Sequence, residues 1–283
     1  MASVHTNMGA MMALQNLNRT NSELQTTQMR INTGLKVSTA KDNGAVYNIA
    51  QQMRSEKSAL DAIRGGLDRA KSIADVALAA GEALSDVFVQ MRDKAVAAAD
   101  PSISATSRAA YNQEFIALRD QVGSIIANAV FDGANILGGG AALTFQANTT
   151  GTQTLTLPTL DLRLVAAPAV IATPPAAIYL GTGADLTTQA NAADARDRVL
   201  ASLTFVNSEL ARLGASAKRV ESHAIFVGKL QDSITGGIGN MVDADLASES
   251  ARLQSLQVKQ QLGTQALSIA NQAPQSILSL FRN

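Results

Sequence analysis

Apolar residues recur at alternating spacings of three and four along most of the chain, which is the heptad pattern of helices that pack side by side. The longest such stretch runs from residue 60 to 95, extends backwards to residue 46, and ends before Pro101. Similar stretches cover residues 111–125 and 199–241. We therefore expect three helices in the body of the chain, and the first, of about 55 residues, would be ~80 Å long.

Both ends of the chain carry the same heptad signal, over residues 10–35 and residues 242–270. Polar residues, Asn21 and Gln260 among them, interrupt these apolar seams. A polar seam residue can fix the register and the partner of a helix pair, or it can be a tolerated, partly hydrated position; the sequence leaves both open. The seam positions that we expect to form an assembly surface are Leu14, Leu17, Asn21, Leu24, Gln28, Ile31, Leu35, Val242, Leu246, Leu253, Leu256, Gln260 and Leu267.

The middle of the chain differs sharply in composition from both ends. Between residues 133 and 184 the only charged residues are Asp161 and Arg163, and four of the six prolines fall there. Glycine, proline and threonine in short alternating runs predict turns and short strands rather than helix. The expected fold is therefore mainly α: an elongated antiparallel helical or coiled-coil rod formed by both termini, with a small β-hairpin or strand-rich central insert.

Terminal helices with one apolar seam and few charges leave an exposed apolar surface if they project from the main bundle. Such a surface usually marks an interaction site. If the partner is a second copy and the contact is head-to-tail, the product is a ring or an open helical fibre. The position of the seams thus suggests self-assembly.

Composition and charge exclude several other classes of protein. The 283 residues include 23 basic and 23 acidic side chains and no cysteine, so neither a disulfide framework nor a thiolate metal site is possible, and nothing favours nucleic acid. The apolar run from Met8 to Leu14 is far too short to span a bilayer, and no basic region precedes it. We expect no membrane insertion and no cleaved signal peptide.

No group of residues has the spacing of a catalytic, cofactor or metal site. His5 and His223 lack paired spacing, and His223 is expected to be an exposed helix histidine. Asp243 and Asp245 would point apart on a helix, so they are expected to act as N-terminal charges at the start of the last helix. The expected protein is not an enzyme.

Four segments resemble conserved parts of bacterial flagellins. Residues 30–45 (RINTGLKVSTAKDNGA) and 257–282 (QVKQQLGTQALSIANQAPQSILSLFR) are similar to the N-terminal and C-terminal signatures of the family. Residues 242–250 (VDADLASES) resemble the acidic stretch that opens its last helix, and residues 131–137 (FDGANIL) resemble the turn into its hairpin. The matches lie at both ends of the chain and in the right order.

The resemblance implies a short flagellin: a structural subunit of the bacterial flagellar filament that self-assembles into a helical polymer for swimming motility. It implies an extracellular filament protein, exported through the type III apparatus, with other flagellin subunits, an export chaperone and the filament cap as partners. The alternatives are a hook–filament junction protein and a coiled-coil adaptor that forms closed oligomers. The implied domains are a filament core of residues 1–44 and 243–283, a rod of residues 45–137 and 188–242, and an outward-facing insert of residues 138–187.

One family motif is only partly present. Many flagellins carry a segment in the first long helix that an animal innate-immune receptor recognises, and residues 87–96 (VFVQMRDKAV) occupy that place. Arg92 matches one arginine of the motif, whereas Gln90 replaces the other and Lys94 replaces its central leucine. The resemblance therefore implies weak recognition by this receptor.

Overall fold

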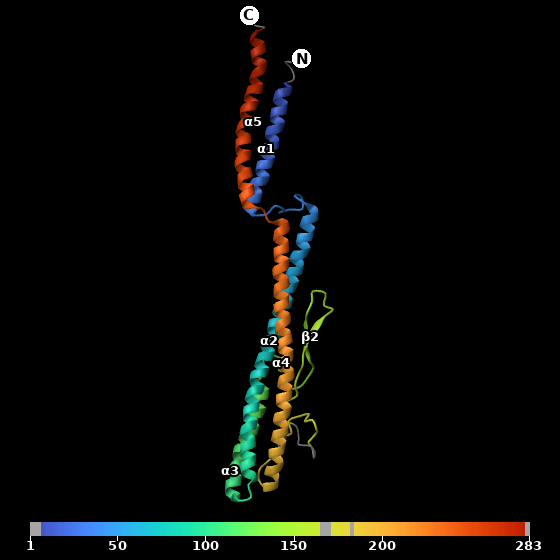
Figure 1. Cartoon of the computed structure of the whole chain (residues 1–283), viewed down its shortest axis with the longest axis vertical. Helices are drawn as coiled ribbons and strands as arrows, with labels where there is room; N and C mark the ends of the chain where they lie inside the picture. Colours follow the sequence, from blue (N-terminus) through green and yellow to red (C-terminus); the bar gives the residue numbers. More distant parts are fainter. Residues whose placement is uncertain (1–6, 165–170, 182–183, 281–283) are drawn as a thin grey trace. The chain divides into compact units, whose positions relative to one another are not determined.

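The computed structural model describes residues 7–164, 171–181 and 184–280, with side chains described up to residue 272. The parts of the expected domains that fall on residues 1–6, 165–170, 182–183 and 281–283 lie outside this description. The chain forms two compact units: a terminal unit of residues 1–57 and 232–283, and a central unit of residues 58–231. The elements, labelled in Figure 1, are α1 (Met8–Thr33), α2 (Gly44–Ala99), α3 (Ala105–Asn128), β1 (Leu143–Gln146), β2 (Thr154–Leu157), α4 (Gln189–Val242) and α5 (Leu246–Leu280).

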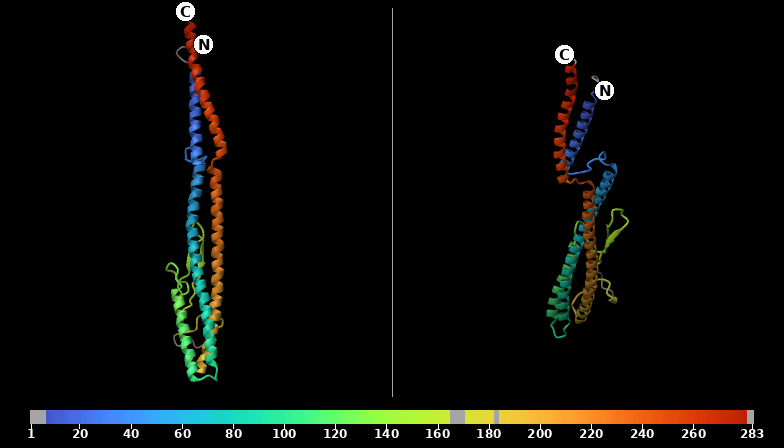
Figure 2. Two further views of the ribbon diagram at one scale, coloured as in Figure 1. Left: turned by 90° about the vertical axis from the view of Figure 1, so that its left-hand side faces the viewer. Right: turned by 45° about the horizontal axis from the view of Figure 1, so that its top comes forward.

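In the central unit, α2 and α4 run antiparallel with α3 beside them (Figures 1 and 2). The Ser85 hydroxyl lies 2.9 Å from the Asn207 side chain, and Gln231 donates a hydrogen bond to Asp61 at 2.8 Å. The backward extension of the α2 pattern to residue 46 fails at Ile49, which is 49% exposed while the adjacent Ala50 is buried. From residue 60 onwards the expected heptad residues are all buried, which confirms that the pattern marks the packed face of this part of the helix. They are Leu60, Ile63, Leu67, Ala70, Ala74, Ala77, Gly81, Leu84, Phe88, Met91 and Ala95.

The turns at both ends of α3 follow from local side-chain chemistry. The Ser104 hydroxyl caps the helix by accepting a hydrogen bond from the Ser107 amide at 3.1 Å. After the helix, Asp132 and Gly133 both have positive φ, and Phe131 and Ala134 exchange two backbone hydrogen bonds. This Asp-Gly turn is of the kind that reverses the chain within two residues. The first three residues of segment 131–137, Phe131, Asp132 and Gly133, are therefore residues of this turn.

The insert contains less strand than its composition predicts. Among the described residues of the insert, only β1 and β2 form a ladder, antiparallel and four residues long, with Phe145 opposite Leu155. Residues 160–164, expected to alternate as a strand, contribute only isolated bridges at Asp161 and Leu164. The fold class of a mainly α chain with a small β-hairpin is nevertheless confirmed.

The hairpin is fastened to α4 by two contacts. His223 Nε2 lies 2.7 Å from the Ala147 carbonyl oxygen, and the Arg219 guanidinium donates to the Thr156 carbonyl oxygen at 3.2 Å. His223 is half-buried under the hairpin and stacks at a tilt on Phe226, so the expectation of an exposed histidine is wrong. The residues on either side of His223 in the sequence have no pattern that predicts a contact between this turn of α4 and the insert.

The tight α2–α4 contact at Gly81 generates a stability prediction. A Cβ at Gly81 would overlap the Leu210 side chain, whereas Gly65 in the same helix has no atom nearby. Gly65→Ala should stabilise the chain by about 1 kcal/mol through helix propensity. Gly81→Ala should instead destabilise it, because overpacking costs ~1–3 kcal/mol. Urea unfolding followed by circular dichroism would measure both, and equal stabilisation by the two substitutions would contradict this packing.

Candidate assembly surface

Helices α1 and α5 of the terminal unit lie side by side and antiparallel (Figures 1 and 2). Asn21 accepts a hydrogen bond from Gln260 at 2.8 Å, and Arg30 forms an ion pair with Glu249 at 2.9 Å. Near the other end of the pair, the Asn7 amide donates to the Ala270 carbonyl oxygen at 2.7 Å, while its carbonyl caps α1. These pairs favour a register-fixing role for the polar seam residues, because each joins one helix to the other.

Apolar seam residues pack between these polar pairs. The helices approach closely at Gly263, where a Cβ would lie 3.1 Å from Leu17 Cδ1 and 4.0 Å from the Leu17 backbone. Leu256 is buried, and five further apolar seam residues of the two helices are half-buried: Leu17, Leu24, Ile31, Leu253 and Leu267. The two helices therefore meet along most of the expected seam.

Three of the expected seam residues are not enclosed by the helix pair. Leu14 and Leu246 remain about half exposed, at 47% and 50%. Gln28 is exposed, and the adjacent Thr27 is the buried residue of that turn, at 2% exposure. The placement of Gln28 inside the seam is corrected accordingly.

Leu35, which follows the end of α1, packs against a small core of the terminal unit that consists of Val37, Ala50 and Val242. Val242 ends α4 in this core. Its carbonyl oxygen accepts hydrogen bonds from the Lys36 and Val37 amides, and the Ala244 amide donates to the Gly34 carbonyl oxygen. The link from α1 to α2 is thus tied to the link from α4 to α5.

A carboxylate organises the loop that leads into α2. Asp42 Oδ2 accepts hydrogen bonds from the amide and the hydroxyl of both Ser38 and Thr39, at 2.9–3.1 Å. These bonds, the Thr39 amide foremost, lower the pKa of Asp42 because they stabilise its ionised form. The STAKD part of the segment 30–45 is therefore a structural motif that shapes the loop.

Asp245 performs the role expected at the start of the last helix. Its Oδ1 accepts hydrogen bonds from the Ala247 and Ser248 amides at 3.0 and 3.3 Å. The carboxylate therefore satisfies two of the amides that an α-helix leaves unpaired at its N-terminus.

The helix pair leaves much of its apolar surface uncovered. Among the described residues, α1 buries only Thr27 and α5 buries only Leu256 below one tenth exposure. Nine of the seventeen exposed large apolar side chains of the described chain belong to these two helices, a concentration that marks an interaction surface rather than scattered surface residues. They are Met8, Met11, Met12, Leu14, Met29, Leu246, Val258, Leu262 and Ile269.

Charge is distributed unevenly along the pair. Residues 8–18 of α1 and residues 260–280 of α5 contain no charged side chain. Nearer the links to α2 and α4, Glu23 pairs with Arg19 at 3.1 Å and with Arg252 at 3.9 Å. The pair thus has an uncharged half, residues 8–18 and 260–272, and a half in which charges pair with each other.

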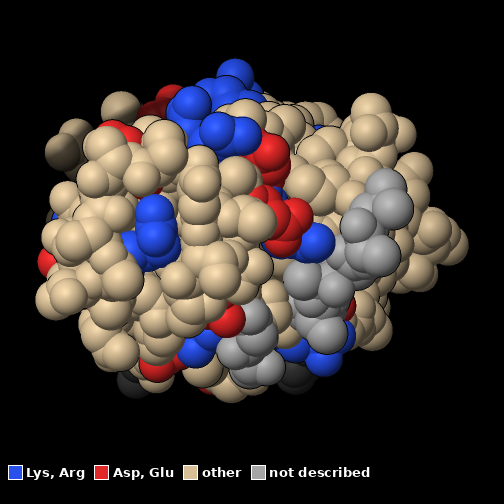
Figure 3. Space-filling model, turned by 90° about the horizontal axis from the view of Figure 1, so that it is seen from below, with Lys and Arg blue, Asp and Glu red and all other residues tan. Residues whose placement is uncertain are grey.

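Charges on the central unit are intermixed. Figure 3 views the end where α2 leads into α3 and shows small, separate groups of acidic and basic side chains on a mostly uncharged face. In the receptor-motif segment of α2, Arg92 and Gln90 are exposed. Lys94 pairs with Glu114 and lies over the Tyr111 ring, and the hydrogen bond with Glu114 raises the pKa of Lys94.

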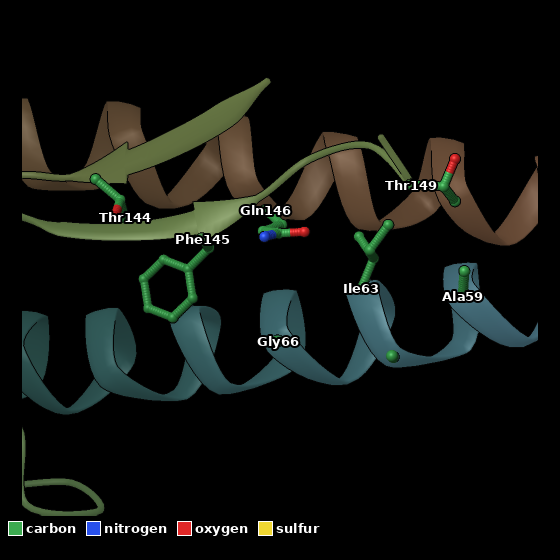
Figure 4. Close-up of a pocket in the computed structure, with 8 residues that line it drawn as sticks. Ala59, Ile63, Gly66, Thr144, Phe145, Gln146 and Thr149 are labelled. Carbon is green, nitrogen blue, oxygen red and sulfur yellow. The ribbon is translucent and has the colours of Figure 1, made fainter. Parts of the chain in front are cut away.

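A groove of about 430 Å³ lies between the hairpin and α2 in the central unit. Figure 4 shows Phe145 pointing from β1 towards α2 near Gly66, while Ile63 and Ala59 line the helix side. The side chains that line the groove are apolar, hydroxyl or amide groups, and none of them is ionisable. Across the described ranges, no three His, Cys, Asp or Glu residues gather as metal ligands would. Within the same ranges, none of the helices combines the length and apolarity needed to cross a bilayer.

The Arg30–Glu249 pair generates a prediction about the helix pair. The second oxygen of Glu249, Oε2, is buried and makes no hydrogen bond within the described chain. Arg30→Met would leave this carboxylate unpaired and should destabilise the pairing of α1 and α5 by about 1–3 kcal/mol. Hydrogen exchange of the amides of both helices would report this loss.

Two variants serve as controls for this measurement. Arg30→Met combined with Glu249→Leu should recover most of the protection, because no buried charge remains. Arg19→Met removes a pair whose arginine is 80% exposed and should change little. Equal exchange rates in the Arg30→Met and Arg19→Met variants would show that the mostly buried pair has no special role.

Comparisons with known proteins agree on one family. The chain matches the family models described as the bacterial flagellin N-terminal helical region, over residues 4–142, and the C-terminal helical region, over residues 197–281. Flagellin FljK of Caulobacter vibrioides is 47% identical over 99% of this chain and 98% of its own length. A Brucella melitensis flagellin is 36% identical over the whole of both chains. A crystal structure of Bacillus cereus flagellin aligns at 20% identity with a TM-score of 0.48, over 57% of this chain and 87% of that chain. The two family models and the full-length relatives show that this chain belongs to the bacterial flagellin family.

Proposed function

We propose that the chain assembles through its terminal unit, with the uncharged half of the α1–α5 pair as the main contact between copies. As a flagellin, the chain is a structural subunit of the bacterial flagellar filament and polymerises with other flagellin subunits. The observation that carries the proposal is the concentration of exposed apolar side chains on two helices that bury almost nothing by themselves. A second copy would cover this surface without having to desolvate a charge.

The polar pairs across α1 and α5 support this role in a second way. A helix that is ordered only on association must lose its conformational entropy at that moment. Hydrogen bonds from Asn7 to Ala270 and from Gln260 to Asn21 hold the two helices in one register beforehand. The exposed seam residue Leu14, which lies between these two hydrogen bonds along α1, is then held in a fixed position, which lowers the entropic cost of assembly.

We propose the division of the chain into filament core, rod and insert on the same basis. Residues 1–44 and 243–283 would form the filament core, residues 45–137 and 188–242 the rod, and residues 138–187 the outward-facing insert. The compact terminal unit extends further, to Lys57 and back to Asp232. The small core of Val37, Ala50 and Val242 accounts for this extension, because it joins the first turns of α2 and the last turns of α4 to the terminal helices.

The cellular context is proposed from the family. The protein would be exported by the flagellar type III apparatus without a cleaved signal peptide, would be escorted by an export chaperone, and would be added beneath a filament cap. Its mechanism would be mechanical, with no catalytic step and no cofactor. Flagellin relatives of the same length favour the filament subunit over a hook–filament junction protein. A coiled-coil adaptor would form closed oligomers instead.

Electron microscopy of the purified chain with filament seeds tests this function. The intact chain should give long, uniform fibres, and a chain that ends at Val242 should give none because it lacks α5. Compact particles from the intact chain, with closed oligomers in solution, would contradict the filament role and favour the adaptor.

A single charge in the seam should block assembly. Leu253 is half-buried in α5, and Leu253→Lys would place an ammonium in the apolar seam of the α1–α5 pair that assembly requires, at a cost of several kcal/mol. The central unit should keep its helix content, because its core is untouched. Thr150→Lys, in the exposed hairpin loop, is the matched control and should still form fibres. Normal fibres from Leu253→Lys would exclude this seam as an assembly surface.

The partial receptor motif gives a separate expectation. Arg92 is exposed and available for contact, but Lys94 stands where the family motif has leucine and is held by Glu114. We expect weak activation of the innate-immune receptor in a reporter-cell assay, and partial recovery in a Lys94→Leu variant. Full potency of the unmodified chain, equal to that of a flagellin with the complete motif, would refute this expectation.

A further inference from the structure

The exposed methionines of the described chain all lie on one helix. Met8, Met11 and Met12 are 66%, 61% and 63% exposed, and Met29, on the same helix α1, is 48% exposed. In contrast, Met91 is fully buried in the core of the central unit. Met53 and Met241 are half-buried. Among the described methionines, oxidants in solution therefore meet thioether sulfur mainly on α1.

Met8, Met11 and Met12 form one cluster on the surface of α1. Their spacings of three and four place them on neighbouring positions of one helix face. The side of α1 that contacts α5 is marked by Leu17 and Asn21, and the methionines lie on the exposed side. They belong to the uncharged half of the pair, where no charged side chain shields them. The cluster thus places three largely exposed thioether side chains on the proposed assembly surface.

We propose that Met8, Met11 and Met12 are an oxidation site at which hydroperoxides reversibly switch off assembly of the free chain. The inference rests on the proposed function, because it needs the uncharged half of the α1–α5 pair to be buried between copies. Once a copy is incorporated, the same contact should cover the three sulfur atoms and protect them. Oxidation would then act on unassembled chains and spare finished polymer.

The chemistry is a two-electron oxygen transfer. A lone pair of the methionine sulfur attacks one oxygen of hydrogen peroxide, the O–O bond breaks, and the remaining oxygen leaves as water after proton transfer. The sulfur is oxidised to the sulfoxide and the peroxide is reduced. Methionine sulfoxide reductases reverse the change.

The physical effect follows from the polarity of the product. A sulfoxide oxygen is a hydrogen-bond acceptor, and burying it in an apolar contact without a donor is unfavourable. In the uncharged half no Lys or Arg side chain is at hand to donate to it. One sulfoxide in the contact should slow or weaken elongation at least about tenfold, since an unpaired buried polar group typically costs that factor or more.

The experiment uses the full chain, hydrogen peroxide and filament seeds. Peptide mass spectrometry would follow oxidation at each methionine in the free chain and in seed-grown polymer. Met8, Met11 and Met12 should oxidise faster than Met91 in the free chain and should be protected in polymer. Elongation by the oxidised chain should fall at least about tenfold and should return after treatment with the reductases.

Two variants assign the effect to the cluster. A chain with Met8→Leu, Met11→Leu and Met12→Leu keeps the apolar surface and should elongate seeds equally well before and after peroxide. Met29→Leu keeps the cluster and should lose elongation on oxidation, as the unmodified chain does. Undiminished elongation by oxidised unmodified chain would overturn the inference alone, and so would equal loss in the triple variant. Failure of the untreated chain to elongate seeds would overturn the proposed function, and this inference with it.

Discussion

The antiparallel pairing of α1 and α5 in a fixed register is the constraint on which the rest of the terminal unit depends. Neither helix has a core of its own, and each would be marginal in water as an isolated helix. The pairing is held by polar contacts between residues more than two hundred positions apart, such as Asn21 with Gln260 and Arg30 with Glu249. Because the register is set in this way, one set of apolar side chains faces inward and a second set stays exposed, which is the surface that we propose contacts other copies.

The distribution of charge separates two tasks along the same helix pair. The Arg30–Glu249 ion pair joins the two helices near their links to α2 and α4, and Arg252 lies 3.9 Å from Glu23 across the pair. The other half has no charge to desolvate, so burial of its methionine and leucine side chains can favour association directly. The hairpin of the central unit also has few charges, but it is rich in hydroxyl groups, and His223 and Arg219 fasten it to α4. The amino-acid composition thus already distinguishes the apolar surface that we propose for assembly from the hydroxyl-rich insert.

Heptad spacing predicted the packed face of α2 from Leu60 to Ala95, because apolar residues at regular intervals of three and four define one face of a helix. The same method failed at Thr27 and Gln28. From Leu24 to Ile31, spacings of three then four and of four then three fit equally well, and both candidate residues are polar. The shorter β-branched Thr27 is the one enclosed. Contacts that depend on the return of the insert over α4, such as His223 with Ala147, leave no periodic signal and could not be predicted.

The central claim is that the uncharged half of the α1–α5 pair is buried between copies of the chain. Cryo-electron microscopy of the assembled polymer measures this most directly, through the surface that each residue loses on assembly. The account predicts that residues 8–18 and 260–272 lose most of their exposed surface to neighbouring copies, while Thr150 and the hairpin loop around it keep theirs. A polymer in which Met8, Met11 and Met12 stay open to solvent, and copies meet mainly through the hairpin, would contradict it.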